Sequence, residues 1–253
     1  MTYEDIVVSK QDGIGLIRLN RPKVLNALSK NLYQEVDDAV YELESDDEIK
    51  VLVFTGTGER AFSGGADIHE QVRDAESPPP YDPRRAEQAW NIAATSKPTI
   101  GALNGLCYGG GAVMASSFDI RIGCERTSFR FLAASYGRVN STWTLPLQVG
   151  WPKAKELLLT ARVVNAKEAY HMGLLNHLVE AEQLMDKSME LAEQIAGNDA
   201  RMVQGIKNIM VDDIGLSWRG MHDNEASARQ GKLAATPVEE GFSEFIARKG
   251  RKN

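Results

Sequence analysis

Three short runs of apolar and β-branched residues in the first half of the chain limit what it can fold into. They are VLVFTG at 51–56, TIGALNG at 99–105 and IRIG at 120–123. Continuous apolar strands of this length are typical of parallel sheets that helices cover on both faces. A further strand at 14–20 and a helical pattern at 32–44 come before them. We therefore expect an α/β fold, either layered or spiral.

The second half of the chain is predicted to be helical. Asn165 is expected to cap one of these helices and Gly173 to end it. Between the predicted strands, RDAESPPPYDPRR at 73–85 combines prolines with two clusters of charge, which indicates a mobile surface loop. The helical patterns cover 152–161, 165–173, 181–196, 199–213 and the tail from 237, which has a basic end.

Composition excludes several classes of function. The formal net charge is −6 with no long basic run, which argues against general binding of nucleic acid, since phosphate neutralisation needs clustered Lys and Arg. No apolar run approaches the ~20 residues of a membrane span, and the start MTYEDIVVSK lacks the pattern of a signal peptide. Cys107 and Cys124 have no metal-ligand spacing and are interpreted as buried thiols in a reducing compartment. We expect a cytoplasmic protein.

Three consecutive glycines, Gly109 to Gly111, open the apolar stretch YGGGAVMASS. Glycine costs about 1 kcal/mol relative to alanine inside a helix. At a helix start it lets the backbone approach a ligand, and it leaves N–H groups pointing outward. The stretch predicts either a site for an anion or developing negative charge, or a tight strand-to-helix turn with close packing. It contains neither of the glycine fingerprints of nucleotide-binding loops.

A second pair of glycines, Gly64 and Gly65, follows the buried strand 51–56. Two glycine turns on neighbouring strands can aim two backbone N–H groups at one oxygen. That is the arrangement that an oxyanion hole requires.

With these segments the chain resembles the crotonase (enoyl-CoA hydratase/isomerase) superfamily over nearly its whole length. The resemblance implies a spiral of ββα turns and assembly as a homotrimer or a dimer of trimers. It implies a core over 1–195 and a C-terminal helical region over 196–253 for trimerisation or as a lid. The matching segments, in family order, are LNRPKVLNALS (19–29), VLVFTGTGERAFSGGADI (51–68), KPTIGALNGLCYGGGAVMASSFDIRIG (97–123), AKEAYHMGLLNHLVE (166–180) and EEGFSEFIARK (239–249).

The same resemblance implies an acyl-CoA as the ligand, with coenzyme A as part of the substrate and no permanently bound cofactor. The oxyanion-hole N–H groups of the family map onto Ala66 and Gly110. Lys23 and Val24 match the stretch that lines the path of adenine and pantetheine.

Further positions at the edge of the implied ligand also match the family. Asp67 and Ile68 border the ligand in relatives. Phe242 and Lys249 lie where the C-terminal helix closes over the nucleotide, although a solvated basic helix end is an equally good interpretation of them.

Two glutamates that family hydratases use are missing from this sequence. Their positions map onto Val113 and Ala133, and no Asp or Glu lies between Glu125 and Glu156. Hydration of a double bond needs one group to activate water and one to protonate carbon. Because valine and alanine can do neither, literal hydratase or isomerase activity is not expected.

The loop SYGRVNSTWTLP at 135–146 also departs from the family pattern. Relatives that decarboxylate malonyl-type thioesters, or that dehalogenate or cyclise acyl groups, place a Tyr or Asp near Asn140. Asn140 can orient a carboxylate or a water, and Arg138 can pair with a substrate carboxylate. Tyr136 and Trp143 complete the candidates. The alternative is a surface loop at a trimer contact, with Trp143 as a packing anchor.

Two residues remain as candidates for general base chemistry. Glu87 lies on a helix that borders the acyl pocket in relatives, and His69 follows the oxyanion segment. Solvated positions are the alternative for both. The histidines show no metal-ligand spacing, so no metal site is expected.

The hypothesis from sequence is an enzyme that stabilises a thioester enolate, with decarboxylase or hydrolase chemistry favoured over hydration. Two alternatives remain. One is a crotonase homologue that binds acyl-CoA without catalysis, and the other is a C–C hydrolase of a β-diketone without coenzyme A.

Overall fold

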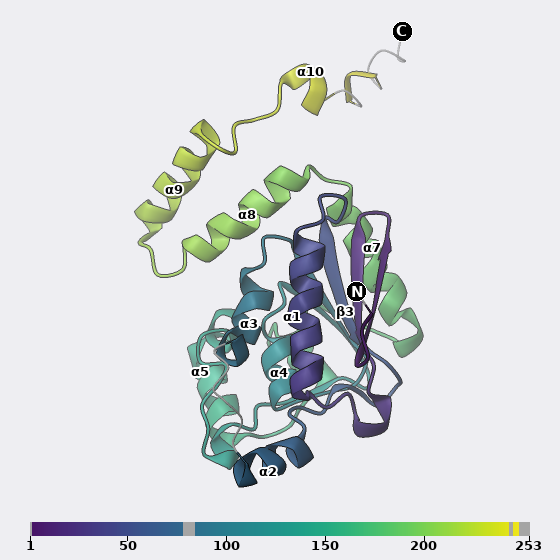
Figure 1. Ribbon diagram of the computed structural model, residues 1–253. Coiled ribbons are helices and arrows are strands. Elements are labelled where there is room, and N and C mark those ends of the chain that lie inside the picture. The colour runs from purple at the N-terminus through teal and green to yellow at the C-terminus, as the bar shows by residue number, and fades with distance from the viewer. Residues whose placement is uncertain (1, 78–83, 243–244, 248–253) are drawn as a thin grey trace. The chain divides into compact units, whose positions relative to one another are not determined.

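The computed structural model of the chain describes residues 2–77, 84–242 and 245–247. It divides into two compact units, Met1–Ala200 and Arg201–Asn253. The first unit contains two sheets and the second is helical (Figure 1). The strands are β1 (Ile6–Gln11), β2 (Ile14–Leu19), β3 (Val51–Gly56), β4 (Ala61–Ser63), β5 (Thr99–Leu103), β6 (Leu106–Tyr108), β7 (Ile120–Cys124), β8 (Ser128–Arg130), β9 (Val164–Asn165) and β10 (His177–Val179).

The first unit also contains helices between and after these strands. They are the 3-10 turns η1 (Pro22–Val24), η2 (Ala134–Tyr136) and η3 (Ala181–Gln183), and the α-helices α1 (Lys30–Glu44), α2 (Ile68–Glu76), α3 (Arg84–Ala94), α4 (Gly110–Ala115), α5 (Leu145–Thr160), α6 (Ala166–His171) and α7 (Leu184–Ala196).

Each turn of the chain adds one strand to each of two sheets. The larger sheet has the order β1-β2-β3-β5-β7-β10 and the smaller one β4-β6-β8-β9. Thus β3 is followed by β4, β5 by β6 and β7 by β8, and the strands of successive turns pair in parallel within each sheet. The predicted α/β fold, a spiral of ββα turns, is confirmed.

Alternate residues of β3 face opposite sides of the larger sheet, as the two-residue period of a strand requires. Leu52 and Phe54 join the main core, which also contains the apolar face of α1. Val51 and Val53 join a second cluster with α7. The two helices therefore cover opposite faces of the sheet, which explains why the strand is apolar throughout (Figure 1).

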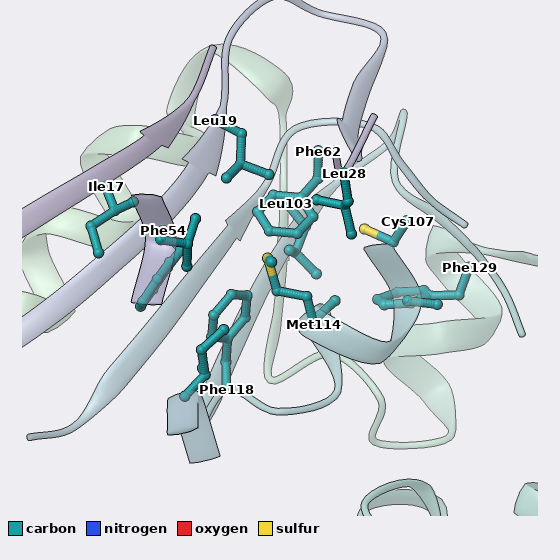
Figure 2. Packing of buried hydrophobic residues seen from close by; sticks show 14 of the residues in the cluster. Ile17, Leu19, Leu28, Phe54, Phe62, Leu103, Cys107, Met114, Phe118 and Phe129 are labelled. Atoms are coloured by element: carbon teal, nitrogen blue, oxygen red, sulfur yellow. The ribbon is translucent and has the colours of Figure 1, made fainter. Parts of the chain in front are cut away.

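Aromatic rings fill the main core between the two sheets. Phe118 stacks on Phe54 with ring centroids 4.7 Å apart and meets Phe62 edge-on at 5.9 Å. Met114 of α4 belongs to the same cluster (Figure 2). The helix that begins at the glycine cluster is thus fixed by core packing.

Several predictions of local structure are confirmed. The three apolar runs form β3, β5 and β7. The side chain of Asn165 accepts a hydrogen bond from the Glu168 N–H at 2.9 Å and caps α6. Gly173 follows that helix with a φ of +83°.

The predicted loop at 73–85 is wrong at both ends. Residues 73–76 form the last turn of α2, and residues 84 and 85 begin α3. Helix α2 begins after the Asp67 cap and extends to Glu76, so the charged residues at 73–76 are helical. The prolines come after the helix in the sequence. Residues 78–83 lie outside the described part.

The second unit contains α9 (Trp218–Gln230), α10 (Val238–Gly241) and most of α8 (Ala200–Asp212). The Arg201 guanidinium donates to the carbonyls of Lys232 and Ala234, both at 3.1 Å, and so ties the chain after α9 back to α8. The division after residue 200 falls shortly beyond the boundary expected from sequence. The role of this region in trimerisation or as a lid stays a prediction.

Candidate active site

Three adjoining hollows in the described part of the first unit share Gly110 and Asn140 in their linings. The loop pocket, of about 380 Å³, lies between the two glycine turns and residues 132–140. The α3 pocket, of about 410 Å³, lies between α1, α3 and residues 139–143. The α2 pocket, of about 400 Å³, lies between α1 and α2. Together they form what we call the cleft.

The position of Ala66 is fixed by a short parallel β-bridge to Leu28. The Leu28 N–H donates to the Gly65 carbonyl at 2.8 Å, and the Asp67 N–H donates to the Leu28 carbonyl at 3.1 Å. Successive peptide groups of an extended chain point in opposite directions, so the Ala66 N–H points away from this bridge. Among the described residues, it has no protein acceptor.

The second N–H of the predicted oxyanion hole belongs to Gly110, the first residue of α4. It has no protein acceptor in the part of the chain that the structure describes. A β-carbon placed on Gly110 would lie 3.6 Å from the Ala66 nitrogen. The structure therefore brings together the two backbone donors that the sequence predicted.

The glycines also let the two turns touch. Gly65 has a φ of +101°, and a β-carbon on it would lie 2.7 Å from the Tyr108 carbonyl oxygen. A β-carbon on Gly111 would lie 2.4 Å from the Ser63 carbonyl oxygen. Close packing is therefore part of what these glycines do, and it is compatible with a site at Gly110.

The two positions onto which the hydratase glutamates map both line the cleft. Val113 lines the α3 and α2 pockets, and Ala133 lines the loop pocket. The cleft thus presents apolar side chains at both places.

The loop predicted to carry function contributes several walls of the cleft. Tyr136 and Arg138 line the loop pocket, and the Arg138 guanidinium donates to Gln71 Oε1 at 3.1 Å. Trp143 lines the α3 pocket and lies against Trp90 with ring centroids 5.8 Å apart. Trp143 therefore lines a pocket and also packs against another ring, so both interpretations of this residue hold.

Asn140 stands where the three pockets meet. Its Oδ1 is buried and has no hydrogen-bond partner among the described residues. The next residue, Ser141, has a φ of +56° and an equally unpartnered Oγ. Strained backbone and unsatisfied polar atoms are features that cluster at functional sites.

Several other predicted residues lie elsewhere. Glu87 is exposed, and its neighbour Gln88 lines the cleft instead, because one residue rotates a helical side chain by about 100°. His69 is exposed on α2 and does not line the cleft. Lys23 and Val24 are exposed on η1, outside the cleft.

The remaining candidates are divided between the two units. Asp67 lines the α2 pocket, and Ile68, although 60% exposed, lines the loop pocket. Phe242 belongs to the second unit and is exposed. Lys249 lies outside the described residues.

Asp67 connects the ligand-bordering segment to the N-terminal part of the chain. Burial raises its pKa, but hydrogen bonds from the Glu70 N–H and from Arg21 outweigh burial, and the pKa lies below its usual value. The Arg21 guanidinium reaches Asp67 Oδ2 at 3.1 Å.

Sequence reasoning missed Tyr33 and Asp37, both on α1. Tyr33 lines the α3 and α2 pockets, and Asp37 lines the α3 pocket one helical turn later. Burial, followed by the carboxylate of Asp37, raises the pKa of Tyr33 to about 12. The available signal was two polar residues at i, i+4 spacing beside the apolar stripe of α1.

A sequence profile described as "Enoyl-CoA hydratase/isomerase" matches residues 9–251. The chain belongs to this family.

Among family members, "Crotonyl-CoA hydratase" of Syntrophomonas wolfei is 31% identical over 253 residues, covering 98% of this chain and 97% of the relative. "Short-chain-enoyl-CoA hydratase" of Clostridium acetobutylicum is 33% identical over 206 residues, covering 78% and 77%. A crystal structure of an enoyl-CoA hydratase from Bacillus anthracis has a TM-score of 0.87 at 26% identity, covering 97% of both chains.

No helix in the described ranges is long and apolar enough to cross a membrane.

Proposed function

We propose that this chain is an enzyme that acts on an acyl-CoA by stabilising a thioester enolate, and that it removes a carboxylate from a malonyl-type thioester. The observation that carries the proposal is the combination of two free backbone donors, on Ala66 and Gly110, with apolar side chains at 113 and 133. Enolate stabilisation needs the donors. Hydration would in addition need a base and an acid.

In the proposed reaction, the thioester oxygen accepts hydrogen bonds from the Ala66 and Gly110 N–H groups. The bond between the α-carbon and the carboxylate breaks, its electron pair forms the enolate, and carbon dioxide leaves. The α-carbon then takes up a proton. Asn140, at the junction of the pockets, would orient the carboxylate, and Arg138 would recognise it at the entrance.

The carboxylates of the α2 pocket support this choice because they are already engaged. Asp67 pairs with Arg21, Glu70 accepts from the Lys30 N–H at 2.8 Å, and Asp74 pairs with the Lys30 ammonium. The pKa of Asp67 lies below its usual value, which makes its carboxylate a weaker base.

The first test supplies the purified protein with malonyl-CoA, methylmalonyl-CoA and crotonyl-CoA in separate reactions. We expect carbon dioxide and the shortened thioester from one of the first two, and no loss of the conjugated thioester absorbance with crotonyl-CoA. A known hydratase assayed in parallel validates the last measurement. Hydration of crotonyl-CoA at the rate of that control would overturn the proposal, and so would binding of all three thioesters without turnover, which is expected of a non-catalytic homologue.

A further inference from the structure

The hydroxyl of Tyr33 lies at the same point of the cleft as the two backbone donors. That point is where a β-carbon on Gly110 would stand, and glycine leaves it open. Tyr33 Oη is 2.9 Å from it, the Ala66 nitrogen is 3.6 Å from it, and the Gly110 nitrogen is two covalent bonds away. One oxygen atom close to this point is therefore within reach of three hydrogen-bond donors.

The fold holds the Tyr33 ring in this place. Its helix is capped by Ser29, whose hydroxyl accepts a hydrogen bond from the Leu32 N–H at 3.1 Å. The ring packs against the main core, while the hydroxyl reaches the linings of the α3 and α2 pockets. Because the ring is packed against the core, the hydroxyl can shift by a few tenths of an ångström but stays in the cleft.

The hydroxyl is a donor without an acceptor. Among the residues that the structure describes, Tyr33 Oη has no hydrogen-bond partner. Its raised pKa keeps it protonated at neutral pH. Phenylalanine would fill the same space in the core, so packing alone does not account for a hydroxyl here.

We infer that Tyr33 is a further catalytic residue, whose hydroxyl donates a third hydrogen bond to the enolate oxygen of the bound thioester. The inference rests on the proposed function, because it needs a thioester held by Ala66 and Gly110. Tyr33 keeps its proton throughout and no covalent bond forms. A neutral donor of this kind strengthens its hydrogen bond as charge develops on the oxygen.

The test uses acetoacetyl-CoA, which carries an acidic α-carbon and whose enolate absorbs in the near ultraviolet. The apparent pKa of the bound ligand is measured by titrating that absorbance in the wild type, Tyr33→Phe and Tyr41→Phe. Tyr41 is the matched control, since it lies on the same helix and is 75% exposed. A hydrogen bond to the charged form lowers a pKa.

We expect Tyr33→Phe to raise the apparent pKa of the bound ligand by about one unit, a tenfold loss of enolate relative to the keto form. Tyr41→Phe is expected to match the wild type. The substitution changes no charge around the ligand. The charged groups that line the α3 and α2 pockets are Lys30, Asp37, Asp67, Glu70, Asp74 and Arg138.

An unchanged pKa in Tyr33→Phe, with acetoacetyl-CoA bound, would overturn the inference and leave the proposed function standing. Loss of binding only in Tyr33→Leu, with Tyr33→Phe like the wild type, would identify a packing role and also overturn it. Failure of the wild type to bind acetoacetyl-CoA would overturn the inference, and failure to bind malonyl-CoA as well would overturn the proposed function itself. Circular dichroism of each variant verifies that it is folded.

Discussion

The Tyr33 hydroxyl lies 2.9 Å from the position that a β-carbon on Gly110 would occupy. Gly110→Ala would place a methyl group there, beside Leu28 Cδ1 at 3.0 Å. Both neighbours are ends of side chains, which can yield by a few tenths of an ångström. The chain is therefore expected to fold with the proposed enolate position filled.

For Gly110→Ala we predict a loss of kcat of about 10²–10³-fold, comparable to the loss of one oxyanion-hole donor. Alanine keeps the backbone N–H, but its methyl group would displace the reacting oxygen from the donors. The measurement is steady-state kinetics with the active thioester, alongside thermal unfolding. Gly197→Ala is the control, because Gly197 has an ordinary helical φ of −74°. Full activity in Gly110→Ala would mean that the reacting oxygen lies elsewhere.

Arg138→Gln tests recognition of the substrate carboxylate. A charge-assisted hydrogen bond contributes about 1.5–3 kcal/mol, so we predict that KM for the malonyl-type thioester rises by about tenfold or more. Affinity for butyryl-CoA, which lacks the carboxylate, is expected to stay the same. Arg126→Gln serves as the control, since Arg126 pairs with Glu59 and does not line the cleft. Equal losses for both thioesters would contradict this role.

Asp67→Asn tests the electrostatics of the segment that carries Ala66. The folded-state pKa of Asp67 lies below its usual value. Its contribution to stability is therefore present above the unfolded pKa of about 3.9 and is lost as the pH falls through the folded value. We predict a variant that is about 0.5–1 kcal/mol less stable at pH 7, with a gap that closes below about pH 4. Urea unfolding from pH 3 to pH 7 measures it, and a gap independent of pH would refute the assignment.

Phe118→Ala tests the core beneath α4. The ring is 2% exposed and contacts both Phe54 and Phe62 (Figure 2). Removing a buried phenylalanine costs about 3–5 kcal/mol, and we expect that loss in the free energy of unfolding. Tyr41→Ala, at an exposed position, is expected to cost much less. A small effect at Phe118 would show that the aromatic cluster repacks around the gap.

The sequence by itself determined four strands of the larger sheet, β2, β3, β5 and β7, and the two glycine turns. Strands β3, β5 and β7 could be predicted because helices or strands cover both faces of the sheet there, so the strand residues form an almost unbroken apolar run. The turns at Gly64–Gly65 and Gly109–Gly111 can be recognised in the sequence because each contains a glycine that backbone contacts require. A β-carbon on Gly65 or Gly111 would lie 2.7 or 2.4 Å from a backbone oxygen. Burial of a strand and the backbone geometry of a turn both restrict the types of consecutive residues, so both can be predicted from a short stretch of sequence.

Only the tertiary structure decided which side chains share the cleft. Tyr33 lies 77 residues before Gly110 in the sequence, and no local pattern links the two. On α3, a rotation of one residue placed Gln88 in the cleft and Glu87 in solvent. Such positions depend on how the helices pack against the sheets. Because the whole core determines that packing, a local stretch of sequence does not predict it.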